Sequence, residues 1–138
     1  MSMAALEVGN AIPELKVTPD KYLTARYAGA SGDFNPIHHD EEFARAAGNP
    51  TVFGHGMLTA GFVARCLTNF VGAGNLRRYK VRFATRVWPG DTITCTGTVT
   101  RCYEVDGQAL IDGECVATNQ KGETAVTGTF TAAVPAGA

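Results

Sequence analysis

Residues 56–71 read GMLTAGFVARCLTNFV, and apolar side chains occupy one helical stripe and most of the remaining surface of this segment. A helix that is apolar nearly all round is normally buried. Its small residues Ala60, Gly61 and Ala64 let a broad surface lie close against it. The segment therefore predicts a central helix, and a curved sheet wrapped around that helix meets both conditions.

Residues 75–134 read as four strands in series, because apolar and polar side chains alternate along them and turn signals separate them. Such alternation indicates one covered face and one wetter face. The expected strands and turns are 79–87, 92–100, the Asp106-Gly107 hairpin turn, 108–118, the Lys121-Gly122 turn and 124–132.

Residues 1–74 mix shorter elements. A strand interrupted by Pro13 is expected over residues 8–17. Thr18-Pro19-Asp20 is typical of a helix start, with a hydroxyl cap, proline at the first position and an acid near the positive helix end. This helix is expected to end at Gly29, and a short second helix is expected over residues 40–47, ended by Gly48-Asn49-Pro50. No repeat or linker divides the chain, which predicts one domain.

Charge and cysteine usage exclude several classes of protein. Twelve basic and thirteen acidic residues give a net charge of −1, without the basic excess that a nucleic-acid or anionic-membrane partner requires. No apolar stretch approaches the roughly 20 residues of a membrane span, and the first ten residues, MSMAALEVGN, do not resemble a secretory signal. We therefore expect a cytoplasmic protein whose cysteines are small buried hydrophobes, at Cys66, Cys95, Cys102 and Cys115.

Polar residues gather immediately before the apolar helix. All three histidines, His38, His39 and His55, lie in this region, together with Asp33 and Asn35. A turn containing Gly, Asn and Pro separates Asp33 from His38, so their side chains can converge on one small molecule. A carboxylate accepts protons and an imidazolium donates them near neutral pH, and no serine or cysteine nucleophile accompanies them. The cluster therefore indicates proton-transfer chemistry.

Residues 54–57, GHGM, lead into the helix, where unpaired backbone N–H groups of the first turn can stabilise a developing oxyanion. The other polar residues have simpler interpretations. His39 is expected on the surface, His55 between two glycines can merely hold the turn together, and Asn35 before Pro36 is a good turn residue. A metal site is not expected, because adjacent histidines seldom point at one ion and no ligand spacing matches a zinc pattern.

Residues 27–38, YAGASGDFNPIH, resemble the signature of the MaoC-like, (R)-specific enoyl-thioester hydratases. Residues 54–59, GHGMLT, are similar to the start of that family's central helix. VRF at 81–83, followed by WPGDT at 88–92, is similar to the strand and turn after it. The resemblance covers most of the chain in the right order. It implies a hot-dog fold of the α+β class, with an antiparallel sheet wrapped around a long central helix, as one domain over residues 1–138.

The resemblance also implies a site and a reaction. Asp33 and His38 would form a catalytic dyad that holds a water, Asn35 would brace the loop, and the N–H of Gly56 would stabilise the thioester oxygen. The reaction would be reversible hydration of a trans-2-enoyl thioester to an (R)-3-hydroxyacyl thioester, without a metal or redox cofactor. Arg86 stands where the family often has proline, at a structural position.

A basic run, Arg77, Arg78, Lys80 and Arg82, has two interpretations. It is either a charged strand that blocks aggregation at a sheet edge, or, at Arg78, Lys80 and Arg82, a dock for the phosphates of coenzyme A or of an acyl carrier protein. A single hot-dog sheet leaves an edge and a face uncovered, so we expect a homodimer or a heterodimer with another hot-dog subunit.

Two other functions are compatible with the sequence. One is a hot-dog acyl-thioesterase, which would direct water at the carbonyl carbon. The other is a subunit of a heteromeric dehydratase that needs its partner for activity. Fatty, polyketide and steroid side-chain acyl groups, on coenzyme A or on a carrier protein, fit these motifs in either reaction direction.

Overall fold

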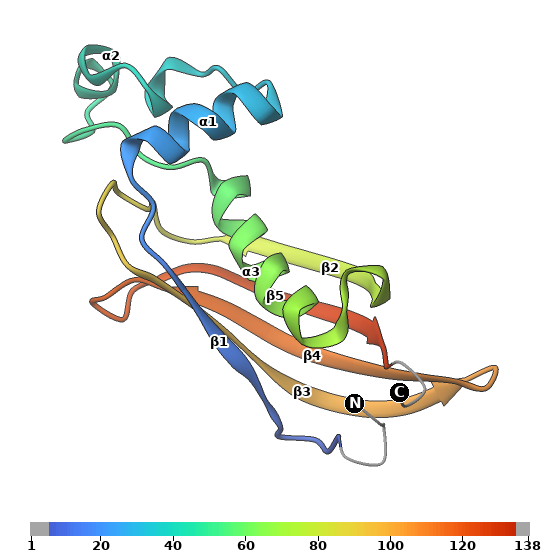
Figure 1. The fold of residues 1–138 in the computed structure, drawn as a ribbon. Helices are drawn as coiled ribbons and strands as arrows, with labels where there is room; N and C mark the ends of the chain where they lie inside the picture. Colours follow the sequence, from blue (N-terminus) through green and yellow to red (C-terminus); the bar gives the residue numbers. More distant parts are fainter. Residues whose placement is uncertain (1–5, 135–138) are drawn as a thin grey trace.

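The computed structural model describes residues 6–134, and the extreme N-terminal and C-terminal residues covered by the single-domain prediction lie outside this range. Five antiparallel strands form one sheet in the order β1-β3-β4-β5-β2. A long helix, α3 (Gly56–Val71), crosses one face of this sheet (Figure 1). The strands are β1 (Ala11–Val17), β2 (Leu76–Phe83), β3 (Ile93–Val105), β4 (Gln108–Thr118) and β5 (Thr124–Ala133). The predicted hot-dog fold is confirmed.

The core lies between α3 and the concave face of the sheet. Val63 and Leu67 of α3 are fully buried, as are Ile93 of β3 and Ile111 of β4. Of the small residues expected to allow a close approach, Ala60 is almost fully buried and Ala64 is half-buried, whereas Gly61 is exposed and nothing lies within 4 Å of a Cβ there, so the expectation is wrong for Gly61. Alternate residues on the opposite face of the sheet are largely threonine or charged and are more exposed.

Turn chemistry fixes the strand register. Asp106 and Gly107 adopt φ values of 50° and 75°, which suit the mirror-image two-residue turns of hairpins, and they join the paired residues Val105 and Gln108. The next turn is held by Asn119, whose side-chain oxygen accepts from the N–H groups of Lys121 and Glu123. Both predicted turns are confirmed.

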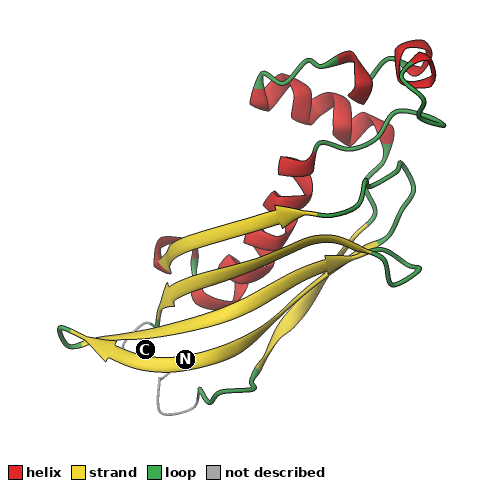
Figure 2. Ribbon diagram, turned by 180° about the vertical axis from the view of Figure 1, so that it is seen from behind, coloured by secondary structure: helices red, strands yellow, loops and turns green. Residues whose placement is uncertain are grey.

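A second layer of short helices lies beyond the N-terminal end of α3, away from most of the sheet (Figures 1 and 2). It consists of α1 (Lys21–Ser31), the 3₁₀ turn η2 (Pro36–His38) and α2 (Glu41–Ala46). A further 3₁₀ turn, η3 (Ala73–Asn75), follows α3. This layer carries the segment that the sequence marked for chemistry.

Two helix boundaries differ from the prediction. The cap of α1 is Asp20, not Thr18, because the Asp20 carboxylate accepts from the N–H of Leu23 at 2.7 Å. The helix passes through Gly29 and ends at Gly32, which adopts a left-handed φ of 77°. A glycine inside a helix weakens it, whereas a glycine just beyond the last turn supplies the left-handed cap. Gly32 fills that role here.

The predicted strand 79–87 is wrong at both ends. Strand β2 begins three residues earlier, at Leu76, and ends at Phe83, which pairs with Val126 of β5. Beyond Phe83 the alternation continues without a partner strand, so the chain leaves the sheet. The carbonyl of Val87 instead accepts from the N–H of Gly54 at 2.8 Å.

The four cysteines are all free, and three of them, Cys66, Cys95 and Cys115, are buried, as predicted, while Cys102 is partly buried. Burial raises the pKa of the Cys95 thiol to about 12 and that of Cys115 to about 11.

Within residues 6–134, no helix is both long and apolar enough to cross a membrane.

Candidate active site

Asp33 lies in the loop between α1 and η2, and successive side chain-to-backbone hydrogen bonds shape that loop. The Ser31 hydroxyl accepts from the N–H of Asp33, Asp33 Oδ1 accepts from the N–H of Asn35, and Asn35 Oδ1 accepts from the N–H of Ile37. Such short polar residues favour turns because they bond to backbone two positions on. The bracing role expected of Asn35 therefore has a structural basis, and Oδ2 of Asp33 remains available.

His38 ends η2 and faces Asp33. Its Nδ1 lies 2.7 Å from the carbonyl oxygen of Phe53, so Nδ1 carries the proton in the neutral ring and donates it to that oxygen. Its Nε2 lies 3.9 Å from Oδ2 of Asp33. The His38 side chain is 11% exposed and that of Asp33 is 52% exposed. The structure therefore brings the two predicted residues together at a place that solvent reaches from the Asp33 side.

Burial lowers the pKa of His38, and this is the largest influence on it. The hydrogen bond to Phe53 raises this pKa in part, His55 lowers it further, and the Asp33 charge raises it. The net effect is a pKa below the ordinary value of 6.5. His38 is therefore neutral near pH 7, with the lone pair of Nε2 directed toward Asp33.

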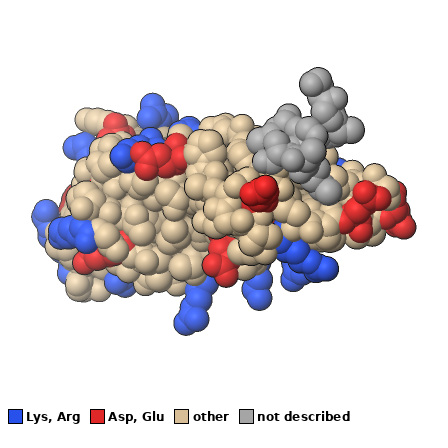
Figure 3. Space-filling model, turned by 90° about the horizontal axis from the view of Figure 1, so that it is seen from below, with Lys and Arg blue, Asp and Glu red and all other residues tan. Residues whose placement is uncertain are grey.

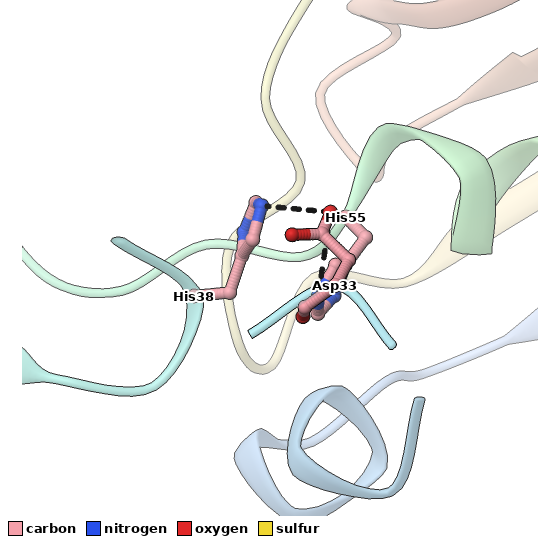
Figure 4. A group of neighbouring side chains, drawn as sticks. All are labelled: Asp33, His38 and His55. Atoms are coloured by element: carbon pink, nitrogen blue, oxygen red, sulfur yellow. Dashed lines mark hydrogen bonds and ion pairs between the residues drawn. The ribbon is translucent and has the colours of Figure 1, made fainter. Parts of the chain in front are cut away.

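His55, the residue before α3, forms the third member of the cluster (Figure 4). It is 2% exposed, and its Nε2 lies 3.0 Å from the carbonyl oxygen of Asp33 and 3.9 Å from Oδ2 of the same residue. Its ring stacks on that of His38 with centroids 3.9 Å apart, and Tyr27 packs edge-on against it. The expectation that His55 only holds its own turn was too narrow, because it reaches across to the Asp33 loop.

A cleft of about 500 Å³ opens beside the start of α3. Aromatic side chains of Phe53, Phe83 and Trp88 line it, together with Gly56 and Thr59. Its volume lies in the range of small-molecule sites, about 300–1,000 Å³. Within residues 6–134, no acceptor is bonded to the N–H of Gly56, the first residue of the helix. The cleft therefore holds an unused donor at the positive end of a helix.

The remaining predicted residues lie elsewhere. His39 is exposed, and its Nε2 lies 3.0 Å from the carbonyl oxygen of Phe34, as expected of a surface residue. Arg78, Lys80 and Arg82 are exposed on β2, an edge strand. Figure 3 shows that Lys and Arg side chains are spread over several parts of the surface and lie among acidic ones. Lys80 and Arg82 border a hollow on the threonine-rich face, so they are not part of the aromatic cleft.

Asp33, His38 and His55 each offer a ligand atom within 4.8 Å of the other two. Tetrahedral zinc holds its donors about 3.3 Å apart, given bonds of about 2.0 Å, and an ion lies near the plane of each imidazole that binds it. The two rings are instead stacked with an interplanar angle of 27°, and Nε2 of His55 is occupied by the Asp33 carbonyl. The arrangement suits a bridging water better than a metal ion.

Comparison with known proteins identifies the family. The family model described as "MaoC like domain" matches residues 7–125, most of the chain. The chain belongs to the MaoC-like family. This MaoC-like chain is 36% identical over 109 residues to an (R)-specific enoyl-CoA hydratase of Rhodospirillum rubrum, covering 69% of this chain and 74% of that protein. It spans only 26% and 9% of the length of two longer curated relatives that it also matches.

Solved structures agree with this assignment. The MaoC-like chain superposes on an (R)-hydratase from A. caviae involved in PHA biosynthesis with a TM-score of 0.85 and 28% identity, covering 95% of this chain and 98% of the other. It superposes on a chain of the ChsH1-ChsH2 complex from Mycobacterium tuberculosis with a TM-score of 0.81 and 31% identity, covering 94% and 98%. The family resemblance stated from the motifs is therefore confirmed.

Proposed function

We propose that this chain is a hydro-lyase that reversibly hydrates trans-2-enoyl thioesters to (R)-3-hydroxyacyl thioesters. The observation that carries the proposal is the pair of proton acceptors, Asp33 Oδ2 and His38 Nε2, 3.9 Å apart at the end of the helix whose Gly56 lines an aromatic cleft. The hydratase name of the Rhodospirillum rubrum relative supports the same reaction.

One water fits between the two acceptors. A water that donates both hydrogens holds its acceptors about 4.4 Å apart when each bond is about 2.8 Å, and somewhat closer when the bonds bend. The 3.9 Å separation of Asp33 Oδ2 and His38 Nε2 suits this arrangement. With both hydrogens engaged, the water directs an oxygen lone pair away from the dyad. That lone pair is the nucleophile that hydration of a carbon–carbon double bond requires.

The proposed addition balances without an outside reagent. The water oxygen bonds to the β-carbon, and the electron pair of the double bond moves toward the thioester oxygen as an enolate. Asp33 takes a proton from the water while His38 Nε2 accepts the other hydrogen, and the proton that was removed is then delivered to the α-carbon on the same face, directly from Asp33 or after transfer to Nε2 of His38. Only a proton and a hydroxide are added, so the reaction needs neither a redox cofactor nor a metal.

Gly56 would stabilise the enolate oxygen. Its N–H is the first of α3, where the helix dipole adds positive potential, and Gly56 lines the cleft. Loss of one such donor in other enzymes costs about 3 kcal/mol in the transition state. The aromatic side chains beside it exclude water from the acyl group, which favours controlled proton transfer.

The direct test is loss of the conjugated enoyl-thioester absorbance with crotonyl-CoA as substrate. Wild type, Asp33→Asn and His38→Ala are compared, and His39→Ala serves as a matched control because His39 is exposed and its side chain bonds to the Phe34 carbonyl instead of to either member of the dyad. We expect both dyad variants to lose most of the rate and the control to retain it. Full activity in folded Asp33→Asn and His38→Ala would place the chemistry elsewhere.

A second candidate is a subunit of a heteromeric dehydratase. The similarity to a chain of the ChsH1-ChsH2 complex favours it, because that protein assembles from two different subunits. This chain contains both members of the dyad, so it would be the catalytic partner. The purified chain would then be inert alone and gain activity with a second hot-dog subunit. Release of free thiol instead of loss of the double bond would indicate a thioesterase.

A substitution on the basic edge tests whether the carrier of the thioester binds there. Arg78, Lys80 and Arg82 are exposed on one strand, as a dock for coenzyme A phosphates or for an acidic carrier protein requires. If they bind the carrier, Arg82→Ala raises KM for crotonyl-CoA but not for the truncated pantetheine thioester, which lacks the nucleotide phosphates. An equal rise in KM for both thioesters would show that the basic edge does not bind the phosphates of the carrier.

A further inference from the structure

We infer that His55 is a positioning residue that holds both members of the Asp33–His38 dyad in place from the buried side of the site. The inference rests on the proposed hydratase function and assigns a role that the sequence motifs left to a turn residue. Three observations carry it: a hydrogen bond to the Asp33 backbone, a stacked contact with the His38 ring and nearly complete burial.

The contact with Asp33 is long-range. His55 Nε2 lies 3.0 Å from the Asp33 carbonyl oxygen, 22 positions earlier in the chain, so the ring donates a hydrogen bond to that oxygen. The other side-chain bonds to the Asp33 loop are local and span two to five positions. Local bonds define the shape of a loop but do not fix its place relative to α3. His55 supplies that link, because it directly precedes the helix.

The contact with His38 fixes a ring orientation. One face of the His38 ring stacks on His55 at 3.9 Å, and Phe53 packs edge-on against His38 at 5.2 Å while its carbonyl bonds Nδ1. The ring is therefore held by both neighbours, with Nε2 directed at Asp33. Tyr27 packs edge-on against His55 and supports it in turn.

His55 does not fit the role of a proton donor or acceptor. Its Nε2 proton is directed at the Asp33 carbonyl, and its Nδ1 is buried with no hydrogen-bond partner among the described residues. At 2% exposure the ring is closed off from solvent, and its Nε2 donates to the Asp33 carbonyl at 3.0 Å, although Oδ2 of Asp33 lies 3.9 Å away. It acts through the two residues that it holds.

His55 is also more than core packing. A buried nitrogen without a partner costs free energy that an apolar side chain of similar size would avoid. The compensating gain in the structure is the N–H donated to Asp33 together with a flat ring against His38. Phenylalanine would retain only the ring, and glutamine would retain only a donor near the position of Nε2. These two substitutions separate the contributions.

The experiment measures kcat and KM for crotonyl-CoA in His55→Phe and His55→Gln, beside wild type, His39→Ala, Asp33→Asn and His38→Ala, after melting curves have confirmed folding. Misplacement of a reacting group by about 1 Å costs about 100-fold in rate and a smaller displacement costs less, so loss of an orienting contact should change activity about 10- to 100-fold. We expect His55→Phe to lower kcat by about that factor with KM changed less than about threefold, and His55→Gln to recover part of the kcat. His39→Ala should behave as wild type. If His55→Phe melts below the assay temperature, His55→Leu replaces it as the variant without a donor.

A folded His55→Phe or His55→Leu with kcat within about twofold of wild type would overturn the inference. So would a loss expressed only in KM, or a His55→Gln variant no better than the variants without a donor. The dyad variants separate this failure from that of the proposed function. If Asp33→Asn and His38→Ala retain activity, the site assignment fails. If only they lose it, His55 alone has been misassigned.

Discussion

The Nδ1 atom of His38 lies 2.7 Å from the carbonyl oxygen of Phe53, and this contact decides that Nε2 is the nitrogen left to face Asp33. A carbonyl only accepts, so Nδ1 must hold the proton in the neutral ring, and Nε2 presents a lone pair to Asp33. The dyad is therefore two acceptors in its resting state, a carboxylate and a neutral imidazole. Two acceptors bind a water through both of its hydrogens, and protonation of either one breaks that arrangement.

The pH dependence of hydration follows from this arrangement. Burial lowers the pKa of His38 below 6.5, and the neutral ring is the form that accepts from water. We therefore expect kcat/KM to be level from about pH 7 upward through the neutral range and to fall as pH drops through the lowered pKa of His38. The check is a pH profile of kcat/KM with crotonyl-CoA. An acid limb centred above pH 6.5 would contradict the lowered pKa.

The same shift predicts how stability depends on pH. The unfolded chain binds a proton at an ordinary histidine, whereas the folded chain resists protonation of His38. Between the two pKa values the unfolded state therefore holds more protons, so the free energy of unfolding decreases as pH falls through this window and is fully retained above it. Urea unfolding at pH 7.5 and pH 5.5 tests this. His38→Gln should lose less stability on acidification than wild type, and His39→Gln should match wild type.

Local signals explain how much of the fold the sequence predicted. The existence and order of the alternating strands, the Asp106-Gly107 turn and the apolar helix 56–71 depend on neighbouring residues and were predicted correctly, but strand ends were not, since β3 was expected to end at residue 100 and continues to Val105. The end of β2 depends on where β5 stops pairing, which no local pattern encodes, so the prediction continued past Phe83. Alternation indicates that a strand has one covered face, and only the burial of its residues in the folded chain shows which face that is.

The candidate site also has a part that the sequence predicted and a part that it did not. Asp33 and His38 lie five positions apart, and their convergence followed from the turn between them. The role of His55 depends on a contact with a residue 22 positions away, which becomes visible only after α3 and the Asp33 loop have been placed. In the sequence, the signal for this role of His55 was its position directly before the helix that begins beside the site.

A test of the cleft concerns Gly56 and Phe83. A methyl group added at Gly56 would lie 3.0 Å from the Phe83 ring, closer than atoms normally approach, so the ring must move. Phe83 is 49% exposed and can swing away. We expect Gly56→Ala to fold but to lose about tenfold or more in kcat/KM, because the displaced ring disturbs the cleft that we propose binds the thioester.

The double variant separates crowding from other causes. Gly56→Ala combined with Phe83→Ala removes the clash, so its kcat/KM should exceed that expected from the sum of the two single effects. A double-mutant cycle on crotonyl-CoA hydration measures this coupling. Additive effects would mean that the Phe83 ring is not what makes glycine necessary at position 56.

The last test concerns Gly128, where β5 approaches β2. A Cβ atom at Gly128 would lie 2.5 Å from the carbonyl oxygen of Lys80 on the paired strand, and a backbone atom moves aside only if the strands separate. We expect Gly128→Ala to lower the free energy of unfolding by about 1–3 kcal/mol, measured by urea denaturation.

Gly61→Ala is the matched control for that substitution. Gly61 is exposed within α3, and nothing lies within 4 Å of a Cβ there, so alanine should stabilise the helix by about 0.5–1 kcal/mol. Equal effects of the two variants would show that the close approach at Gly128 is not required.

The distance between β2 and β5 also sets the position of Phe83, which ends β2 and lines the cleft. Gly128→Ala should therefore lower kcat/KM as well, although it lies outside the dyad, while Gly61→Ala should not.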